Sequence, residues 1–236
     1  MASYVISDIH GEYDKFLDLL QKTGLREEDT LYILGDVVDR GPHPVRTLLK
    51  LMEMPNVVPL VGNHELMALR CLPFLREEIT NELLDRLGDD DFMALQNWIA
   101  NGAGTTLREF RALGAEMQDE VLDFMRDFLA YAEVEAAGRK YLLVHAGLGH
   151  FRRGKAMENY ALNDLVWERP DYSMRYFPDL EVVSGHTPTQ LITENPRKGY
   201  IFRANGHVAI DCGACFQGGR LAALCLETGE GFYSEK

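Results

Sequence analysis

The chain has 236 residues, and its 24 lysines and arginines against 37 aspartates and glutamates give a formal charge of −13. So acidic a surface excludes long nucleic acid as a partner, because that binding depends on phosphate neutralisation by Lys and Arg. Bound divalent cations would offset the charge locally, which leaves small phosphorylated substrates open. No apolar stretch is long enough for a bilayer, and the N-terminus lacks signal-peptide features. We expect a cytoplasmic protein with no membrane partner, folded as one domain over residues 1–236.

The four cysteines are open to two interpretations. Cys212 and Cys215 have the spacing of a redox motif or of half a zinc site, but no second pair completes such a site. The other interpretation takes them as small apolar residues in a buried strand and turn. We favour the second, and we expect free thiols in a reducing compartment.

The first quarter of the chain alternates short apolar runs with helical periodicity. Strands are predicted at residues 4–7, 31–34 and 57–61, and helices at 13–22 and 45–54. This β-α-β-α-β order implies a largely parallel sheet with helices packed on it. In such sheets, ligands bind beyond the carboxyl ends of the strands.

The rest of the chain changes character twice. Residues from about 66 to 130 show helical periodicity and predict a helical insertion, which either walls a cleft or packs on the sheet. Further strands are predicted at 131–136, 140–144, 181–184, 208–210, 221–226 and 231–233. We therefore expect an α/β fold, a sandwich of two mixed sheets flanked by helices.

Three short motifs each follow one of the first three predicted strands. They are Asp8-Ile9-His10-Gly11, Gly35-Asp36-Val37-Val38-Asp39-Arg40-Gly41 and Gly62-Asn63-His64-Glu65. Two further histidines, His145 and His186, also follow apolar runs directly. A single Asp at a strand end is usually a turn former, but five strand ends with the same donor chemistry indicate a shared site. Carboxylate, imidazole and amide oxygen suit a hard or borderline divalent cation.

This combination predicts two-metal hydrolysis of phosphate esters. Two cations that share the Asp36 carboxylate would activate a bridging hydroxide for direct attack on phosphorus. His64, beside Asn63, would then protonate the leaving group, and Asp39 would orient it. Arg40 could hold two phosphoryl oxygens through its planar fork, although an Asp39–Arg40 surface ion pair in a Gly-Pro turn is the alternative.

With these motifs the sequence resembles the PPP-type metallophosphoesterases, and the segment Trp98–Gly104 resembles their small bacterial, lambda phage-type members. The resemblance covers most of the chain and is weakest between residues 71 and 131. It implies one ion on Asp8, His10 and Asp36, and a second on Asp36, Asn63, His145 and His186. It also implies His64 as the proton donor, Asp39 as its partner, and Arg40 and Arg169 as phosphate ligands. Arg175 is an alternative to Arg169.

The first functional hypothesis is a manganese-dependent phosphatase of phosphoserine or phosphothreonine, and also of phosphotyrosine, in proteins. Iron and zinc are alternatives to manganese, because the ligand types permit all three. The second is a symmetrical dinucleoside tetraphosphate hydrolase, for which the basic run Arg152, Arg153 and Lys155 could meet extra phosphates, unless it is a solvated loop. The third is a non-catalytic interaction protein, which the intact set of site residues disfavours. The sequence leaves the oligomeric state open.

Overall fold

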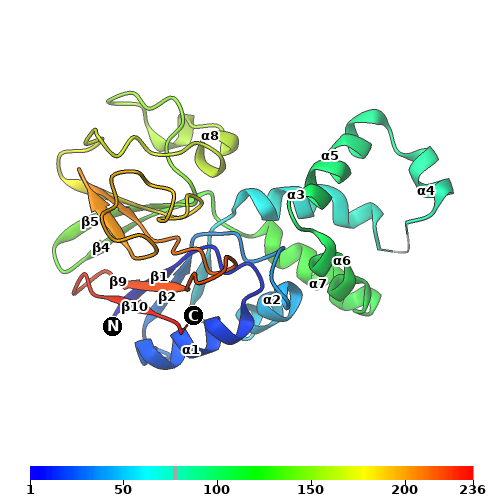
Figure 1. The fold of residues 1–236 in the computed structure, drawn as a ribbon, viewed down its shortest axis with the longest axis horizontal. Coiled ribbons are helices and arrows are strands. Elements are labelled where there is room, and N and C mark those ends of the chain that lie inside the picture. Colours follow the sequence, from blue (N-terminus) through cyan, green and yellow to red (C-terminus); the bar gives the residue numbers. More distant parts are fainter. Residues whose placement is uncertain (77–78, 236) are drawn as a thin grey trace.

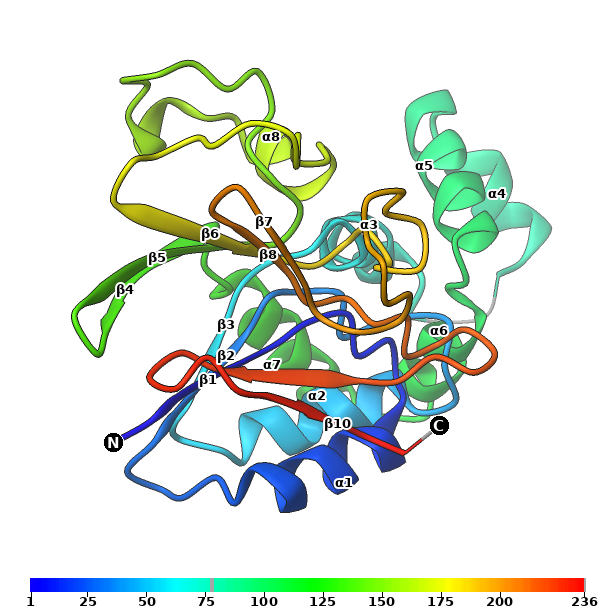
Figure 2. The same ribbon diagram turned by 60° about the vertical axis from the view of Figure 1, so that its left-hand side comes forward.

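The computed structural model describes residues 1–76 and 79–235. Two five-stranded mixed sheets pack face to face, and helices cover their outer sides (Figures 1 and 2). The expected α/β sandwich is therefore confirmed. None of the helices in the described parts of the chain is long and apolar enough to cross a membrane.

The first sheet has the strand order β10-β9-β1-β2-β3. Strands β1, β2 and β3 run parallel, as expected for the β-α-β-α-β order. Strand β9 pairs antiparallel with β1, and β10 pairs antiparallel with β9 at the edge of the sheet. The bounds are β1 Ser3–Ile6, β2 Thr30–Ile33, β3 Val57–Pro59, β9 Ala222–Cys225 and β10 Gly231–Tyr233.

Helices α1 (Tyr13–Thr23) and α2 (Pro44–Met52) lie under this sheet (Figure 2). In α1 the apolar positions fall on one face and bury Phe16 and Leu19, each worth about 1.5–3 kcal/mol of transfer free energy. Gly24 ends the helix at φ 62°, a left-handed conformation that glycine adopts without strain. Pro44 begins α2 at its first turn, where a missing N–H costs nothing.

The second sheet has the order β4-β5-β6-β8-β7. Its strands β5, β6 and β8 are mutually parallel, and β4 and β7 are antiparallel edges. The bounds are β4 Tyr131–Ala136, β5 Arg139–Val144, β6 Leu180–Ser184, β7 Phe202–Ala204 and β8 His207–Ala209. Helix α8 (Leu162–Val166) and a 3-10 turn, η2 (Met157–Asn159), lie between β5 and β6 in the chain.

The core between the sheets consists of side chains from alternate strand positions. Val5 of β1 and Leu224 of β9 meet Leu143 of β5 and Val183 of β6, all at most 1% exposed. The next residue on β1, Ile6, points the other way and packs with the helices under the first sheet. This two-residue alternation is what fixes the register of a strand with both faces covered.

Between β3 and β4 the chain is helical, and we call residues 63–126 the helical segment. It consists of α3 (Asn63–Cys71), a 3-10 turn η1 (Leu72–Phe74), α4 (Asn81–Arg86), α5 (Asp89–Ala100), α6 (Gly104–Arg111) and α7 (Ala115–Arg126). Helices α4 and α5 project away from the sheets (Figure 1). That this segment is an insertion within one domain remains a prediction.

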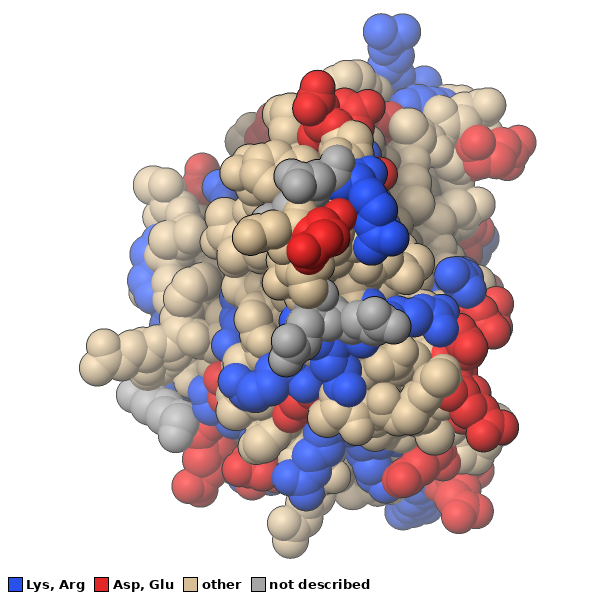
Figure 3. Space-filling model, turned by 90° about the vertical axis from the view of Figure 1, so that its right-hand side faces the viewer, with Lys and Arg blue, Asp and Glu red and all other residues tan. Residues whose placement is uncertain are grey.

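Acidic and basic side chains alternate on the face of the molecule that carries α4 and α5 (Figure 3). Ion pairs tie parts of the helical segment together, with Arg70 3.3 Å from Asp91 and Arg76 2.5 Å from Asp119. The described side chains of this face therefore form no uniformly basic surface.

The predicted elements agree with the structure to within one or two residues at most ends. Strand β7 and helix α8 were not predicted, because both are too short for a periodic pattern. Helix α3 begins at Asn63, three residues before the expected start of the helical insertion at about residue 66, so Asn63 and His64 lie in its first turn. All four cysteines are free thiols, as expected.

Candidate metal centre

The sequence motifs converge from five strand ends. Asp8 and His10 follow β1, Asp36 follows β2, Asn63 follows β3, His145 follows β5 and His186 follows β6. Six non-glycine residues of these motifs have a positive φ, between 47° and 72°: Asp8, His10, Asp36, Asp39, Arg40 and His186. Positive φ is uncommon for residues other than glycine, although Asp and His adopt it more often than most, and it is concentrated at functional sites.

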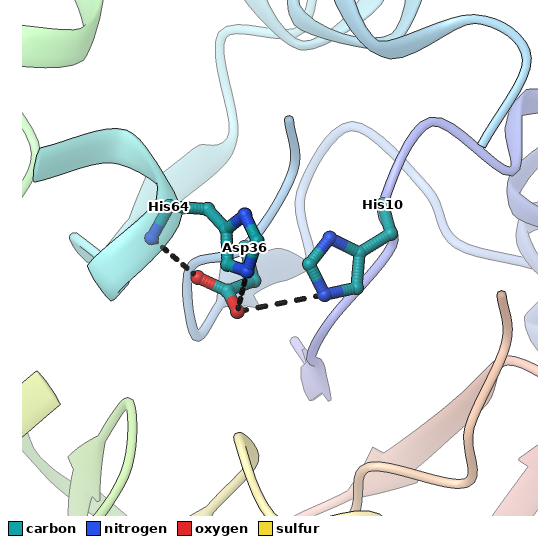
Figure 4. A group of neighbouring side chains, drawn as sticks. All are labelled: His10, Asp36 and His64. Carbon is teal, nitrogen blue, oxygen red and sulfur yellow. Dashed lines mark hydrogen bonds and ion pairs between the residues drawn. The ribbon is translucent and has the colours of Figure 1, made fainter. Parts of the chain in front are cut away.

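Asp36 lies at the centre of this cluster, with its carboxylate between the rings of His10 and His64 (Figure 4). Asp36 Oδ2 is 3.5 Å from His10 Nε2 and 3.9 Å from His64 Nε2. Asp36 Oδ1 is 3.4 Å from His145 Nε2 and accepts the backbone N–H of His64 at 3.1 Å. The two carboxylate oxygens therefore face two different histidine groups, as a bridging ligand requires.

Two groups of potential ligand atoms, each within 4.8 Å of one another, share this carboxylate. One group is His10, Asp36 and His64, and the other is Asp36, His145 and His186. All of these side chains are buried except that of His186, which is partly exposed.

Hydrogen bonds fix the tautomers of two of the histidines. The Nδ1 atoms of His10 and His145 lie 2.8 Å and 2.6 Å from the carbonyl oxygens of Val38 and Leu34, so each Nδ1 carries a proton and donates it. Each Nε2 then has a free lone pair. His10 Nε2 is buried without a partner, and His145 Nε2 faces the Oδ1 atom of Asn63 at 3.0 Å. Acceptor atoms that converge in this way fit a cation between them.

The electrostatics of the cluster favour the same conclusion. Burial lowers the pKa of His10 well below its ordinary value and, together with His145, that of His186 to about 3, so both rings are neutral. Burial raises the pKa of Asp36 well above its ordinary value, and the nearby Asp8 and Glu65 carboxylates add to the rise. A bound cation would favour the ionised carboxylate and would replace the hydration that burial removed.

Asp8 lies outside both groups. Its Oδ2 accepts the Ser7 hydroxyl and, at 2.9 Å, the backbone N–H of His186. The side chain is 3% exposed and joins the ends of β1 and β6. Gly185 leaves room for this contact, because a Cβ there would overlap both the Ser7 hydroxyl and the Asp8 carboxylate.

Glu65 is fully buried and holds the turn around Asp36. Its Oε2 accepts the N–H groups of Asp36 and Gly62 at 2.8 Å and 2.9 Å, and its Oε1 accepts those of Val37 and Val38 at 2.8 Å and 3.2 Å. A carboxylate that accepts four backbone N–H groups compensates its own desolvation. Glu65 therefore connects the start of α3 to the loop after β2.

His64 and Asp39 form the predicted pair. His64 Nδ1 is 2.7 Å from Asp39 Oδ2, and both side chains are fully buried. Two residues of the helical segment complete the environment of Asp39. Trp98 donates its indole N–H to Oδ2 at 2.7 Å, and Thr106 donates its hydroxyl to Oδ1 at 2.6 Å. Burial lowers the pKa of His64, but the carboxylates of Asp36 and Asp39 outweigh it and leave that pKa above its ordinary value.

The face of the cluster opens into a cavity of about 380 Å³, which we call the central cavity. It is lined by Asp36, Arg40, Asn63, Asn101, Trp167, Arg169, His186, Pro188, Leu191 and Phe216. Arg40 Nη2 is 3.0 Å from His64 Nε2. The geometry therefore brings Arg40 and Arg169 to one cavity beside the cluster.

Arg175 and the basic run of Arg152, Arg153 and Lys155 were the other candidates for phosphate contacts, and they lie outside the central cavity. Arg175 donates to the carbonyl oxygens of Phe177 and Pro178, and with Arg153 it lines a different cavity. Lys155 lies 3.6 Å from the centre of the Tyr160 ring and 3.7 Å from Asp164. The residues that line the central cavity do not include Arg175 or any of Arg152, Arg153 and Lys155, so the basic run is not part of that cavity.

Sequence reasoning did not identify Glu65, Trp98 or Thr106 as part of the site. The Glu65 signal was its position three residues after Gly62, where a glutamate caps a helix start. Trp98 and Thr106 gave no local signal, because their contact with Asp39 joins residues 59 and 67 positions apart.

Comparison with known proteins agrees with this fold. The family model for calcineurin-like phosphoesterases matches residues 1–209. The chain therefore belongs to the calcineurin-like phosphoesterase family of metal-dependent hydrolases. The resemblance predicted from the three motifs is confirmed.

Several proteins named as tetraphosphatases are similar to this chain in sequence or in fold. The asymmetrical bis(5'-nucleosyl)-tetraphosphatase PrpE of Halalkalibacterium halodurans is 27% identical over 248 residues, covering 93% of this chain and 88% of the relative. The symmetrical bis(5'-nucleosyl)-tetraphosphatase of Acidovorax ebreus is 31% identical, but the match spans 63% of this chain and only 44% of the relative. The fold matches the crystal structure of a candidate diadenosine tetraphosphatase with a TM-score of 0.69, 18% identity, and coverage of 99% and 93% of the two chains.

These relatives correct the first functional hypothesis. A protein phosphatase of phosphoserine or phosphothreonine was expected from the motifs, and this was wrong, because the relatives over most of the chain are named as dinucleoside tetraphosphatases. The motifs could not separate the two classes, since they hold the metal-site residues and not the groups that contact the rest of the substrate.

Proposed function

We propose that this protein hydrolyses dinucleoside tetraphosphates with two divalent cations, for which manganese is the first choice. The observation that carries the proposal is the central cavity, where two arginines face a cluster of converging acceptor atoms. The similarity to tetraphosphatases along nearly the whole chain supports this substrate class.

The proposed ligands are those that the sequence resemblance implies, and four of them, His10, Asp36, His145 and His186, belong to the two groups of neighbouring ligand atoms. Asp8, His10 and Asp36 would hold one cation, and Asp36, Asn63, His145 and His186 the other. Asp8 uses Oδ2 to bind Ser7 and His186, which leaves its second oxygen for a cation. When bound, the cations supply an activated water and neutralise charge at the attacked phosphorus.

The remaining groups bind and orient the substrate. Arg40 and Arg169 both line the central cavity, and each has a planar guanidinium that matches two phosphoryl oxygens. His64 would give its Nε2 proton to the leaving phosphate oxygen. Asp39 favours the protonated form of His64 and fixes its ring through the bond at Nδ1.

The test is turnover of diadenosine tetraphosphate by the purified protein with excess manganese, with the products separated by anion-exchange chromatography. Two molecules of ADP would show symmetrical cleavage, and ATP with AMP would show asymmetrical cleavage. Elemental analysis of the same sample gives the bound metal. No nucleotide product from protein that carries two metals per chain would overturn the proposal.

A further inference from the structure

The central cavity has an apolar part that the proposed phosphate chemistry does not use. Trp167 is 41% exposed, Phe216 48% and Leu191 63%, and all three line this cavity beside Arg40 and Arg169. Exposed apolar side chains scattered singly are ordinary. Here, however, two of the three exposed phenylalanine and tryptophan side chains of the described residues lie in one cavity, and only Phe92 lies elsewhere.

Both rings line the central cavity with the two arginines, and each ring is close in the sequence to one arginine or to a residue that contacts it. Phe216 directly follows Cys215, whose Sγ is 3.9 Å from Arg40 Nη1. Trp167 is two residues before Arg169, and its ring meets the His186 ring edge-on with centroids 6.1 Å apart. An aromatic surface next to a guanidinium is the combination that binds a base and its phosphate together.

The backbone that carries both rings is held firmly. The backbone N–H of Phe216 donates to the carbonyl oxygen of Gly213 at 2.9 Å, and the carbonyl oxygen of Phe216 accepts the N–H of Gly219 at 2.9 Å. Lys15 from α1 donates to Ala214 O in the same loop. The segment after Trp167 packs on Gly147, where a Cβ would overlap the Glu168 carbonyl. Rings held in this way lose little conformational freedom when a ligand stacks on them.

Trp167 also lines a second cavity of about 200 Å³, together with Asn63, Arg70, Asn97 and Asn163. Asn63 and Trp167 line both cavities, so the second cavity lies next to the central cavity, on the other side of these two residues.

We propose that Trp167 and Phe216 form a nucleobase subsite, in which the base of a nucleotide stacks on these rings while its phosphates contact Arg40 and Arg169. This inference rests on the proposed function and names the residues that select a nucleoside over a plain phosphate. Stacking tolerates any base, because each has a flat π-face. The subsite should therefore favour nucleotides in general rather than one base.

Fluorescence tests the subsite without turnover, because the chain has two tryptophans and Trp98 is fully buried. The probe is the non-hydrolysable α,β-methylene-ADP, and the base-free control is methylenediphosphonate, both with manganese present. We expect saturable quenching by the nucleotide analogue only, and loss of this quenching in Trp167→Phe while Trp98 emission remains. Equal effects of the two ligands, or nucleotide quenching that persists in Trp167→Phe, would overturn the proposal.

Phe216→Ala tests the second ring. Its dissociation constant for α,β-methylene-ADP should rise about tenfold, within the range for one lost stacking contact, and Phe216→Tyr should restore binding. Its dissociation constant for methylenediphosphonate, which has no base, should change much less than that for the nucleotide analogue. Phe92→Ala, at an exposed ring on α5, is the matched control. Equal losses of affinity for the two ligands would contradict the subsite, whereas binding without dinucleotide turnover would contradict only the proposed function.

Discussion

The indole N–H of Trp98 donates to Asp39 Oδ2 at 2.7 Å, the same oxygen that faces His64 Nδ1. Trp98 lies on α5, outside the two sheets, and Asp39 lies in the loop after β2. The helical segment therefore contributes to the hydrogen bonding of the proposed proton donor and is more than a wall of the cleft.

Trp98→Phe tests this positioning role. It removes one donor to a buried carboxylate and keeps most of the ring, so the orientation of His64 should loosen. A hydrogen bond to a charged group contributes about 1.5–3 kcal/mol, and we expect kcat to fall about tenfold or more with KM unchanged. The loss should be large for an alkyl phosphate, whose leaving group needs a proton, and small for p-nitrophenyl phosphate, whose leaving group does not.

The control for this variant is Ile99→Ala, at the neighbouring, 49% exposed position of α5. It should leave both activities unchanged. If Trp98→Phe loses equal activity on the two substrates, or none while its melting temperature is that of the wild type, Trp98 does not position His64.

Asp36→Asn tests the shared carboxylate. The amide is isosteric, but it lacks the charge and one of the oxygens that face the two histidine groups. We expect turnover to fall by more than about 100-fold, beyond the loss typical for groups that only support a ligand. Elemental analysis should show fewer than two cations per chain. Asp14→Asn, an exposed acid on α1, should change neither quantity, and a fully active Asp36→Asn protein would refute the bridging role.

Glu65→Gln tests the link between α3 and the loop after β2. One of the two oxygens that accept four N–H groups becomes an NH₂ group, which faces donors instead of accepting from them. Buried donors left without acceptors cost about 1–3 kcal/mol each, so we expect a loss of about 3 kcal/mol in urea unfolding. Glu53→Gln, at an ion-paired residue 68% exposed at its side chain, should stay within about 0.5 kcal/mol of the wild type. Equal stabilities of the two variants would show that the Glu65 bonds are not important.

Asp29→Asn tests an acid far from the metal ligands. Hydrogen bonds from the backbone N–H groups of Ala2, at 2.6 Å, and of Arg26, at 3.1 Å, hold the pKa of Asp29 below its ordinary value. A lowered pKa means that the carboxylate stabilises the fold above its unfolded-state pKa of about 3.9 and loses this effect as the pH falls through the lower, folded value. The variant should be about 1 kcal/mol less stable at neutral pH, and the difference should shrink below about pH 4. A difference that is constant from pH 3 to 7 would rule out this origin.

The sequence predicted the fold and the approach of the polar motifs because both depend on short-range patterns. Asp36 and His145 each follow an apolar run of a parallel strand, and parallel strands bring their carboxyl ends to one edge. The pattern could not predict which oxygen of Asp36 faces which histidine ring. The positive φ values at Asp36 and His10 set the directions of these side chains, and sequence periodicity does not report them.

The rest of the site depends on contacts between distant parts of the chain. The segment that carries Arg169 into the central cavity packs on Gly147 after α8, whereas Arg175 bonds to the carbonyls of Phe177 and Pro178 and lines a different cavity. The first hypothesis about the substrate, a phosphorylated protein, was wrong for a related reason. The motifs hold the proposed metal ligands, and loop residues such as Phe216, which lines the central cavity, carry no motif, so the motifs alone could not choose between the first hypothesis and the dinucleotide.

The dependence of Asp39 on Trp98 and Thr106 has a thermodynamic consequence. Helices α5 and α6 lie outside the sandwich, and peripheral elements open at a lower free energy than the whole protein. Detachment of these helices would leave both sheets folded while Asp39, the proposed partner of His64, lost two of its hydrogen-bond donors. The temperature at which hydrolytic activity is lost should therefore lie below the temperature at which the β-sheets unfold.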